Sequence, residues 1–139
     1  MVSLARPMLT VDVVVLTDAP LPGLLLVQRA HPPFEGEWAL PGGFVEEGER
    51  VADAGRRELV EETGLEAGGL RLLGVYDTPG RDPRGWTVSI VYLATVTEEV
   101  AVSGADDARD ARWFQADRLP QLAFDHAAIV ADALVRRAE

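Results

Sequence analysis

The stretch that decides the fold runs from Gly43 to Leu65 and reads GFVEEGERVADAGRRELVEETGL. Between Glu49 and Thr63 it contains no proline and is dense in charged residues. Gly64 follows directly, and glycine suits the position just past a helix C-terminus because it adopts a left-handed backbone without strain. The pattern therefore predicts a helix over residues 49–63.

Three glutamates share one face of this predicted helix. Glu58, Glu61 and Glu62 are spaced so that, at about 3.6 residues per turn, they fall within an arc of about 100°. Leu59 and Ala52 point about a quarter turn away, and we expect them to anchor the helix to the core. Oxygen-only ligands favour Mg²⁺ or Mn²⁺ over Zn²⁺. The alternative is a solvated helix face, since Glu is a good helix former.

The wider spacing supports the metal hypothesis. From Gly43 the order is Gly, five residues, Glu, seven residues, then Arg-Glu-apolar-x-Glu-Glu-x-Gly-apolar. This is the Nudix box, and over residues 43–65 the sequence resembles the Nudix hydrolases. Every fixed position of the box is filled, by Gly43, Glu49, Arg57, Glu58, Leu59, Glu61, Glu62, Gly64 and Leu65. One departure is Gly55, where the family usually has Ala; a glycine there costs about 1 kcal/mol but touches no expected ligand.

The resemblance implies a role for each polar position of the box. Glu58, Glu61 and Glu62 would bind the cations, together with the backbone carbonyl of Gly43. Glu49 and Arg57 would pair and hold the preceding loop against the helix. The cations would neutralise a diphosphate and lower the pKa of a water molecule. Glu58 is our choice for the group that acts as base or orients the water.

Members of the family often add an acidic residue from a loop before a late strand. Asp107 lies in Gly104-Ala105-Asp106-Asp107-Ala108, six residues before Trp113, and is our choice, with Asp106 as the alternative. The same residues are also typical of a polar turn without further function.

A second loop bears on the substrate. The run Tyr76 to Gly85 and the run Leu122 to His126 resemble small ADP-ribose pyrophosphatases. Arg81 and Arg84 could reach phosphates or a terminal ribose by bidentate hydrogen bonds, and Asp82 lies between them. The alternative is a solvated connection between two strands, without a ligand.

Aromatic and histidine residues give weaker signals. Four aromatic residues are candidates to stack on an adenine, although aromatic side chains are more often part of a core: Phe34, Trp38, Tyr76 and Trp86. His126 follows Asp125, a candidate helix N-cap, and is expected to start a helix rather than to bind a ligand.

The flanking sequence predicts the rest of the fold. Alternating and β-branched runs predict strands over residues 8–16, 24–29, 70–76, 87–96 and 111–114, and a second helix is expected over residues 126–137. The predicted fold class is α/β, a Nudix-like α/β/α sandwich with a mixed β-sheet between helices. Residues 1–139 are expected to form a single domain, since the chain is too short for two ordinary ones.

Composition narrows the function classes. The 139 residues carry a formal charge of -10, which disfavours nucleic acid polymers as partners. No cysteine is present, so disulfides, thiolate zinc sites and cysteine nucleophiles are excluded. Neither a signal peptide nor a membrane span can be drawn, which predicts a cytoplasmic protein without a membrane partner. The resemblance is compatible with a homodimer.

The leading hypothesis is Mg²⁺-dependent or Mn²⁺-dependent hydrolysis of a small nucleoside diphosphate derivative, with ADP-ribose giving AMP and ribose 5-phosphate. Two alternatives stay open. One is a nucleoside triphosphate pyrophosphohydrolase that removes oxidised nucleotides. The other is a non-catalytic Nudix ligand sensor, which the intact box and the acidic charge disfavour.

Overall fold

A mixed seven-stranded sheet forms the centre of the computed structural model, which describes residues 2–139. Its middle is the parallel pair of β1, Met8–Thr17, and β6, Thr87–Val96, in register from Met8 opposite Thr87 to Thr17 opposite Val96. From Thr10 onward every residue of β1 is buried. A nearly continuous β-branched run is typical of a strand covered on both faces.

The other strands extend this pair on both sides. The order along the sheet is β3-β2-β1-β6-β5, while β4 pairs with β1 and β7 pairs with β2. Their bounds are β2 Gly23–Arg29, β3 Trp38–Ala39, β4 Gly42–Phe44, β5 Arg71–Tyr76 and β7 Ala108–Gln115. The two short strands β3 and β4 were not among the predicted elements, because two or three residues give no periodic pattern.

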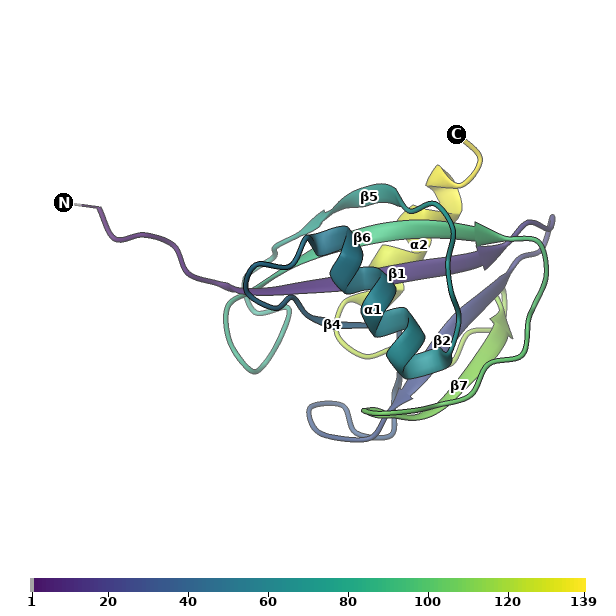
Figure 1. The fold of residues 1–139 in the computed structure, drawn as a ribbon, viewed down its shortest axis with the longest axis horizontal. Helices are drawn as coiled ribbons and strands as arrows, with labels where there is room; N and C mark the ends of the chain where they lie inside the picture. Colours follow the sequence, from purple (N-terminus) through teal and green to yellow (C-terminus); the bar gives the residue numbers. More distant parts are fainter. Residues whose placement is uncertain (1) are drawn as a thin grey trace.

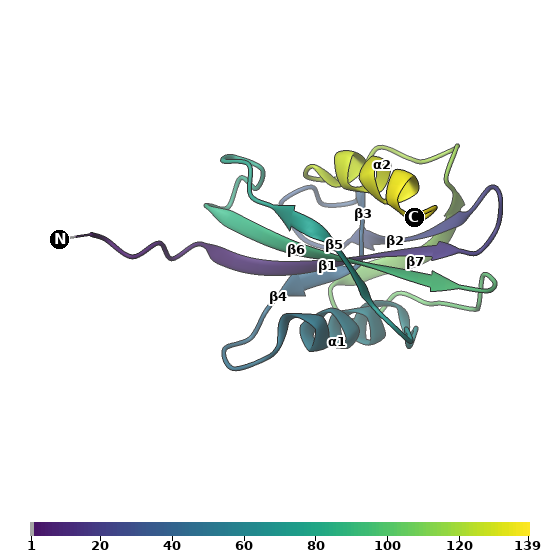
Figure 2. The same ribbon diagram turned by 90° about the horizontal axis from the view of Figure 1, so that it is seen from above.

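Two helices cover opposite faces of the sheet, α1 from Val51 to Thr63 and α2 from His126 to Arg136 (Figures 1 and 2). Leu59 of α1 belongs to one core cluster with Val13 and Leu25, whereas Ile129 of α2 belongs to another with Val14. Alternate residues of β1 therefore face different helices, as a strand in the middle of three layers must. The predicted α/β/α sandwich is confirmed.

The boundaries of α1 differ slightly from the prediction. The helix begins at Val51 rather than at residue 49, and it ends as expected at Gly64, whose φ is 78° and whose N–H bonds to the Val60 carbonyl. The expected anchor Ala52 is only half-buried, which corrects that prediction. The buried apolar face instead contains Ala54, Gly55 and Leu59.

Gly55 has a packing role that the sequence did not show. A Cβ at this position would lie 3.2 Å from a methyl group of Val11 and 3.3 Å from one of Val13. Glycine therefore lets α1 lie close to β1, and this contact brings the glutamates of the helix toward the sheet.

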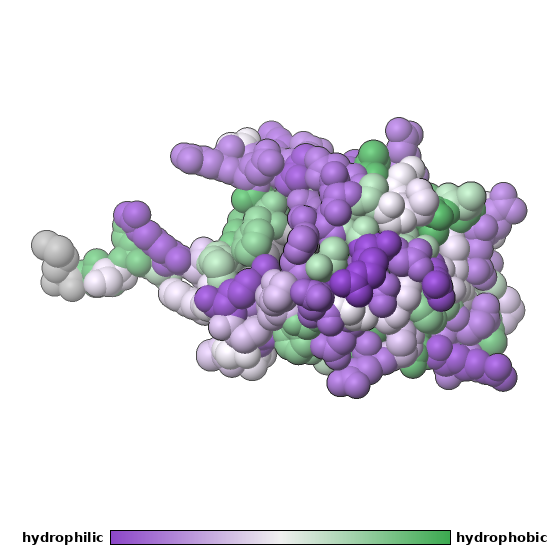
Figure 3. Space-filling model, turned by 90° about the horizontal axis from the view of Figure 1, so that it is seen from below, coloured by the Kyte–Doolittle hydropathy of each residue, from purple (hydrophilic) through white to green (hydrophobic). Residues whose placement is uncertain are grey.

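The loops after β2 and β5 project from one edge of the molecule, and Figure 3 looks onto that edge. Hydrophilic residues predominate on it. Residues 2–7 extend away from the body of the protein at one end of β1. No helix within residues 2–139 is long and apolar enough to cross a membrane.

Candidate functional site

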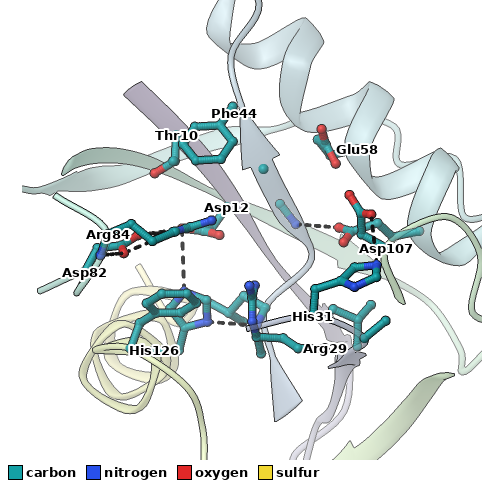
Figure 4. A pocket seen from close by; sticks show the side chains of 18 of the residues that line it. Thr10, Asp12, Arg29, His31, Phe44, Glu58, Asp82, Arg84, Asp107 and His126 are labelled. Atoms are coloured by element: carbon teal, nitrogen blue, oxygen red, sulfur yellow. Dashed lines mark hydrogen bonds and ion pairs between the residues drawn. The ribbon is translucent and has the colours of Figure 1, made fainter. Parts of the chain in front are cut away.

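A pocket of about 380 Å³ opens where the Nudix box meets the sheet and the loop after β5. Carboxylates from α1 and from the turn before β7 lie on one side of it, including Glu58 and Asp107 (Figure 4). Asp82, Arg84 and His126 lie on the other side. The pocket therefore has an acidic wall, with Glu58, Glu62 and Asp107, which faces an arginine wall that includes Arg84.

Glu62 is the most buried carboxylate of the acidic wall. It is 7% exposed, and its Oε1 accepts a hydrogen bond of 2.8 Å from the backbone N–H of Gly42. Burial, together with the nearby charges of Glu58 and Asp12, raises the pKa of Glu62 to about 8. A buried carboxylate among like charges favours either a proton or a cation beside it.

Glu58 lies next to Glu62 and packs against the backbone of β4. A Cβ at Gly43 would lie 2.6 Å from the carboxyl carbon of Glu58, so only glycine lets this carboxylate approach the backbone so closely. Burial raises the pKa of Glu58, although the carboxylate also accepts a 2.9 Å hydrogen bond from Arg57.

Arg57 joins the loop to the helix. Its Nε donates to one oxygen of Glu49 at 2.7 Å and its Nη2 to the other at 3.0 Å, which is the pair that the box implies. Nη2 also donates to the carbonyl of Phe44 at 3.2 Å, and Nη1 donates to Glu61 at 3.3 Å. The hydrogen bond from Arg57 lowers the pKa of Glu49. Arg57 thereby holds residues of the loop and two glutamates of α1 in one arrangement.

The donor set fits a hard divalent cation in its chemistry. Glu58 and Glu62 line the pocket beside the backbone of Gly43, and all of these groups offer oxygen ligands. Glu61 is more exposed and turns toward Arg57, so it does not line the pocket. Within residues 2–139, no three acidic or histidine side chains converge closely enough to form a complete ligand cluster. Bringing Glu61 to a cation would require its side chain to leave Arg57.

The structure places Asp107 and Asp106 differently. Asp107 lies immediately before β7, lines the pocket, and has its carboxylate 3.9 Å from Nε2 of His31. Asp106 has a φ of 52° in the turn before it and does not line the pocket. The geometry thus favours Asp107 as the additional acidic residue at this site.

The two arginines of the loop after β5 also have different surroundings. Arg81 is almost fully buried, and its guanidinium donates to both oxygens of Asp125, at 2.6 and 2.9 Å. Arg84 is about one-third exposed and donates to Asp82 at 2.8 Å from Nη2. Its guanidinium lies 4.9 Å from the centre of the Phe44 ring. Arg81 therefore ties the loop to the start of α2, whereas Arg84 remains accessible from the pocket.

The side chain of Asp125 forms this ion pair and does not cap the helix. It occupies the N-cap position of α2 as expected, but its side chain makes no capping hydrogen bond. We expect Asp125→Asn to lower the free energy of unfolding by about 3 kcal/mol, because the buried Arg81 loses the carboxylate to which it hydrogen-bonds. Urea unfolding would measure this.

Asp53→Asn, which removes one partner of the exposed pair with Arg56, is the control and should change the free energy of unfolding by less than about 1 kcal/mol. Equal effects of the two substitutions would contradict this role for Asp125.

The sequence pattern did not indicate Asp12 as a site residue, and it indicated only a helix start at His126. His126 is buried, and its Nδ1 accepts a 3.0 Å hydrogen bond from the backbone N–H of Leu40. Its Nε2 lies 3.8 Å from Asp12, whose carboxylate also accepts a 2.6 Å hydrogen bond from Ser89. Burial lowers the pKa of His126, so the neutral ring is favoured. An acidic residue within the apolar β1 run was the one available signal for Asp12.

The aromatic residues at the pocket are not the four that the sequence suggested. Trp38 packs edge-on against Phe114 at 4.9 Å and contacts the core cluster, where Tyr76 also packs. Phe44 and Phe124 line the pocket instead. Of the four candidates, Phe34 has its ring 4.8 Å from that of Phe124, which lines the pocket.

The raised pKa of Glu62 leads to a prediction for the metal-free protein. In the folded protein the pKa of Glu62 is about 8, above the ordinary 4.5. The protonated side chain therefore stabilises the folded state fully below pH 4.5, and this stabilisation is lost as the pH rises through about 8. Glu62→Gln keeps an acceptor for Gly42 and does not titrate. At about pH 8.5 we expect this variant to be more stable than the wild type by on the order of 1–3 kcal/mol, with the difference vanishing near pH 4. Urea unfolding in EDTA would measure it, and a variant less stable at both pH values would contradict it.

Residues 6–133 match the model of the NUDIX domain family. An ADP-ribose pyrophosphatase of Methanocaldococcus jannaschii is 47% identical over 127 residues, which cover 91% of this chain and 73% of that protein. The ADPR responsive transcriptional repressor NtrR of Acinetobacter baylyi is 31% identical over 135 residues, which cover 94% of this chain but only 54% of the repressor. The NUDIX domain of Shewanella oneidensis NrtR, in a cocrystal structure with ADP ribose, has a TM-score of 0.87 and 34% identity, covering 96% of this chain and 90% of that one.

Proposed function

This chain belongs to the NUDIX domain family and is a Nudix pyrophosphohydrolase, and on that premise we propose that it hydrolyses ADP-ribose to AMP and ribose 5-phosphate with Mg²⁺ or Mn²⁺. The main support for this proposal is that the pocket has an acidic wall on one side and an arginine wall on the other. A diphosphate can lie between them once cations compensate the acidic wall.

The residues that would hold the cations are Glu58, Glu61, Glu62, the carbonyl of Gly43, and Asp107 from outside the box. Nudix hydrolases generally use divalent metals, and such ions would neutralise the diphosphate and favour ionisation of the attacking water. The pairing of Arg57 with Glu49 keeps the loop and helix at a fixed distance, so that Gly43 stays beside Glu58.

Glu58 has the environment of a general base. Its carboxylate is at the pocket, its pKa is raised by burial, and Arg57 fixes the position of Oε1 at 2.9 Å. A base works best when its pKa lies near the operating pH. Glu58 would accept a proton from the water that attacks phosphorus. The new P–O bond forms as the bridging P–O bond breaks, and the leaving phosphate takes the electron pair.

The choice of ADP-ribose rests on two kinds of support. The curated relative at 47% identity is named an ADP-ribose pyrophosphatase, and a structural neighbour was crystallised with ADP ribose. The pocket also offers two aromatic rings, Phe44 and Phe124, for contact with a base or ribose.

A substrate panel tests the proposal. Purified protein with Mg²⁺ would be incubated in parallel with ADP-ribose, NADH, diadenosine polyphosphates, 8-oxo-dGTP and nucleotide sugars, and the products identified by chromatography. We expect the highest kcat/KM for ADP-ribose, with AMP and ribose 5-phosphate in equal amounts.

The same panel decides between the alternatives. A higher kcat/KM for 8-oxo-dGTP, with release of pyrophosphate, would replace the proposed substrate by an oxidised nucleotide. Tight binding of ADP-ribose without hydrolysis of any compound would replace the enzyme by a ligand sensor.

A further inference from the structure

Four arginines line the pocket, and three of them are neutralised by carboxylates of this chain. The shortest contacts of these three are Arg57 with Glu49 at 2.7 Å, Arg81 with Asp125 at 2.6 Å and Arg84 with Asp82 at 2.8 Å. The fourth, Arg29, has no carboxylate partner in residues 2–139; its Nε donates to the backbone carbonyl of Pro33 at 2.6 Å. Its two Nη groups are left with no hydrogen bond to the described chain.

Arg29 is held in place by an aromatic ring. It is the last residue of β2 and is half-buried, and its guanidinium carbon lies 5.0 Å from the centre of the Phe124 ring. The guanidinium carbon of Arg84 lies 5.5 Å from the same ring. The ring of Phe124 therefore brings two guanidinium groups together at one wall of the pocket.

The backbone at Phe124 supports a positioning role for this ring. Its φ is 54°, in the left-handed region that a bulky side chain rarely adopts. Such a conformation persists only where the surrounding structure enforces it, and it is found most often at ligand sites. Here the turn between Ala123 and α2 directs the ring toward Arg29.

The charge around Arg29 is not balanced by contact. Burial and the neighbouring charge of Arg84 lower the pKa of Arg29, while Glu62, Asp82 and Asp107 act on it in the opposite direction from a distance. Figure 4 shows Arg29 between the side of the pocket with Glu58 and Asp107 and the side with His126. An anion that spans the pocket would lie within reach of the free Nη groups.

We propose that Arg29 is the residue that binds a phosphate of the substrate, through hydrogen bonds from its two Nη groups to non-bridging oxygens, and that Phe124 positions it. Arg84 adds positive charge to the same wall, whereas Arg81 holds the loop after β5 against the start of α2. The inference rests on the proposed function only for the statement that the ligand contains a diphosphate.

Binding of inorganic pyrophosphate tests this without a nucleoside. Isothermal titration calorimetry in Mg²⁺ would compare the wild type with Arg29→Gln, Arg29→Lys and Arg56→Gln. Arg29→Gln is expected to weaken binding by about 10- to 100-fold, because it removes charge-assisted hydrogen bonds. Arg29→Lys should recover part of this loss, since it restores the charge without the bidentate geometry. Arg56 lies outside the pocket and pairs with Asp53, so Arg56→Gln should bind as the wild type does.

The outcomes separate this inference from the proposed substrate. If Arg29→Gln binds pyrophosphate with the affinity of the wild type, the role of Arg29 is overturned. Should Arg29→Gln not fold, an affinity of Arg29→Lys for pyrophosphate equal to that of Arg56→Gln would overturn the role of Arg29 as well. If the wild type fails to hydrolyse ADP-ribose while pyrophosphate binding still depends on Arg29, the inference stands and the proposed substrate fails.

Discussion

Glu58→Gln is expected to lower kcat for ADP-ribose by about 10²- to 10⁴-fold, the contribution of a positioned general base. Glutamine keeps an oxygen that can accept the 2.9 Å hydrogen bond from Arg57, so the arrangement of loop and helix should survive. What is lost is the negative charge and the ability to take a proton. Because burial raises the pKa of Glu58, this substitution should not destabilise the metal-free protein.

Glu66→Gln is the matched control. Glu66 is an exposed glutamate just after α1 and does not line the pocket, so its substitution should leave kcat unchanged. Steady-state kinetics at saturating Mg²⁺, with circular dichroism to confirm folding, would compare the two. A folded Glu58→Gln variant with wild-type kcat would remove Glu58 from the mechanism.

Gly42→Ala is expected to be the most destabilising single methyl addition at the pocket. A Cβ at Gly42 would overlap the backbone carbonyl of Val11 and the carboxylate of Asp12. The backbone there cannot move away easily, because β4 pairs with β1 and the N–H of Gly42 bonds to Glu62. We expect a loss of about 3 kcal/mol or more in the free energy of unfolding, which corresponds to a decrease in Tm of roughly 10 °C.

Gly68→Ala provides the comparison for this variant. Nothing lies within 4 Å of a Cβ built at Gly68, and its backbone does not need a left-handed φ. Its Tm should stay within a few degrees of the wild type. Thermal unfolding followed by circular dichroism measures both, and a Gly42→Ala variant as stable as Gly68→Ala would show that the close contact between β4 and β1 is not required.

Much of the fold follows from local pattern. The end of α1 at Gly64, the buried run of β1 and the position of α2 were predictable because each depends on residues close together in the sequence. The pairing of Glu49 with Arg57 was expected from the box because both residues lie within one loop and helix.

The arginine wall could not be predicted in the same way. Arg81 and Arg84 lie three residues apart on one loop, and the sequence gives no indication that Arg81 pairs with Asp125, 44 positions later. Arg29 ends β2 and meets Phe124 only because the sheet and the start of α2 bring distant segments together. Such contacts depend on tertiary packing, which local patterns do not record.

We propose that the acidic wall acts with a divalent cation on the diphosphate of ADP-ribose. It is tested most directly by following ADP-ribose with the purified wild-type protein after EDTA treatment, before and after Mg²⁺ is added back. We expect no turnover in EDTA and, on addition of Mg²⁺, AMP and ribose 5-phosphate in equal amounts. ADP-ribose that remains intact in Mg²⁺ and in Mn²⁺, or that is cleaved equally fast in EDTA, would contradict it.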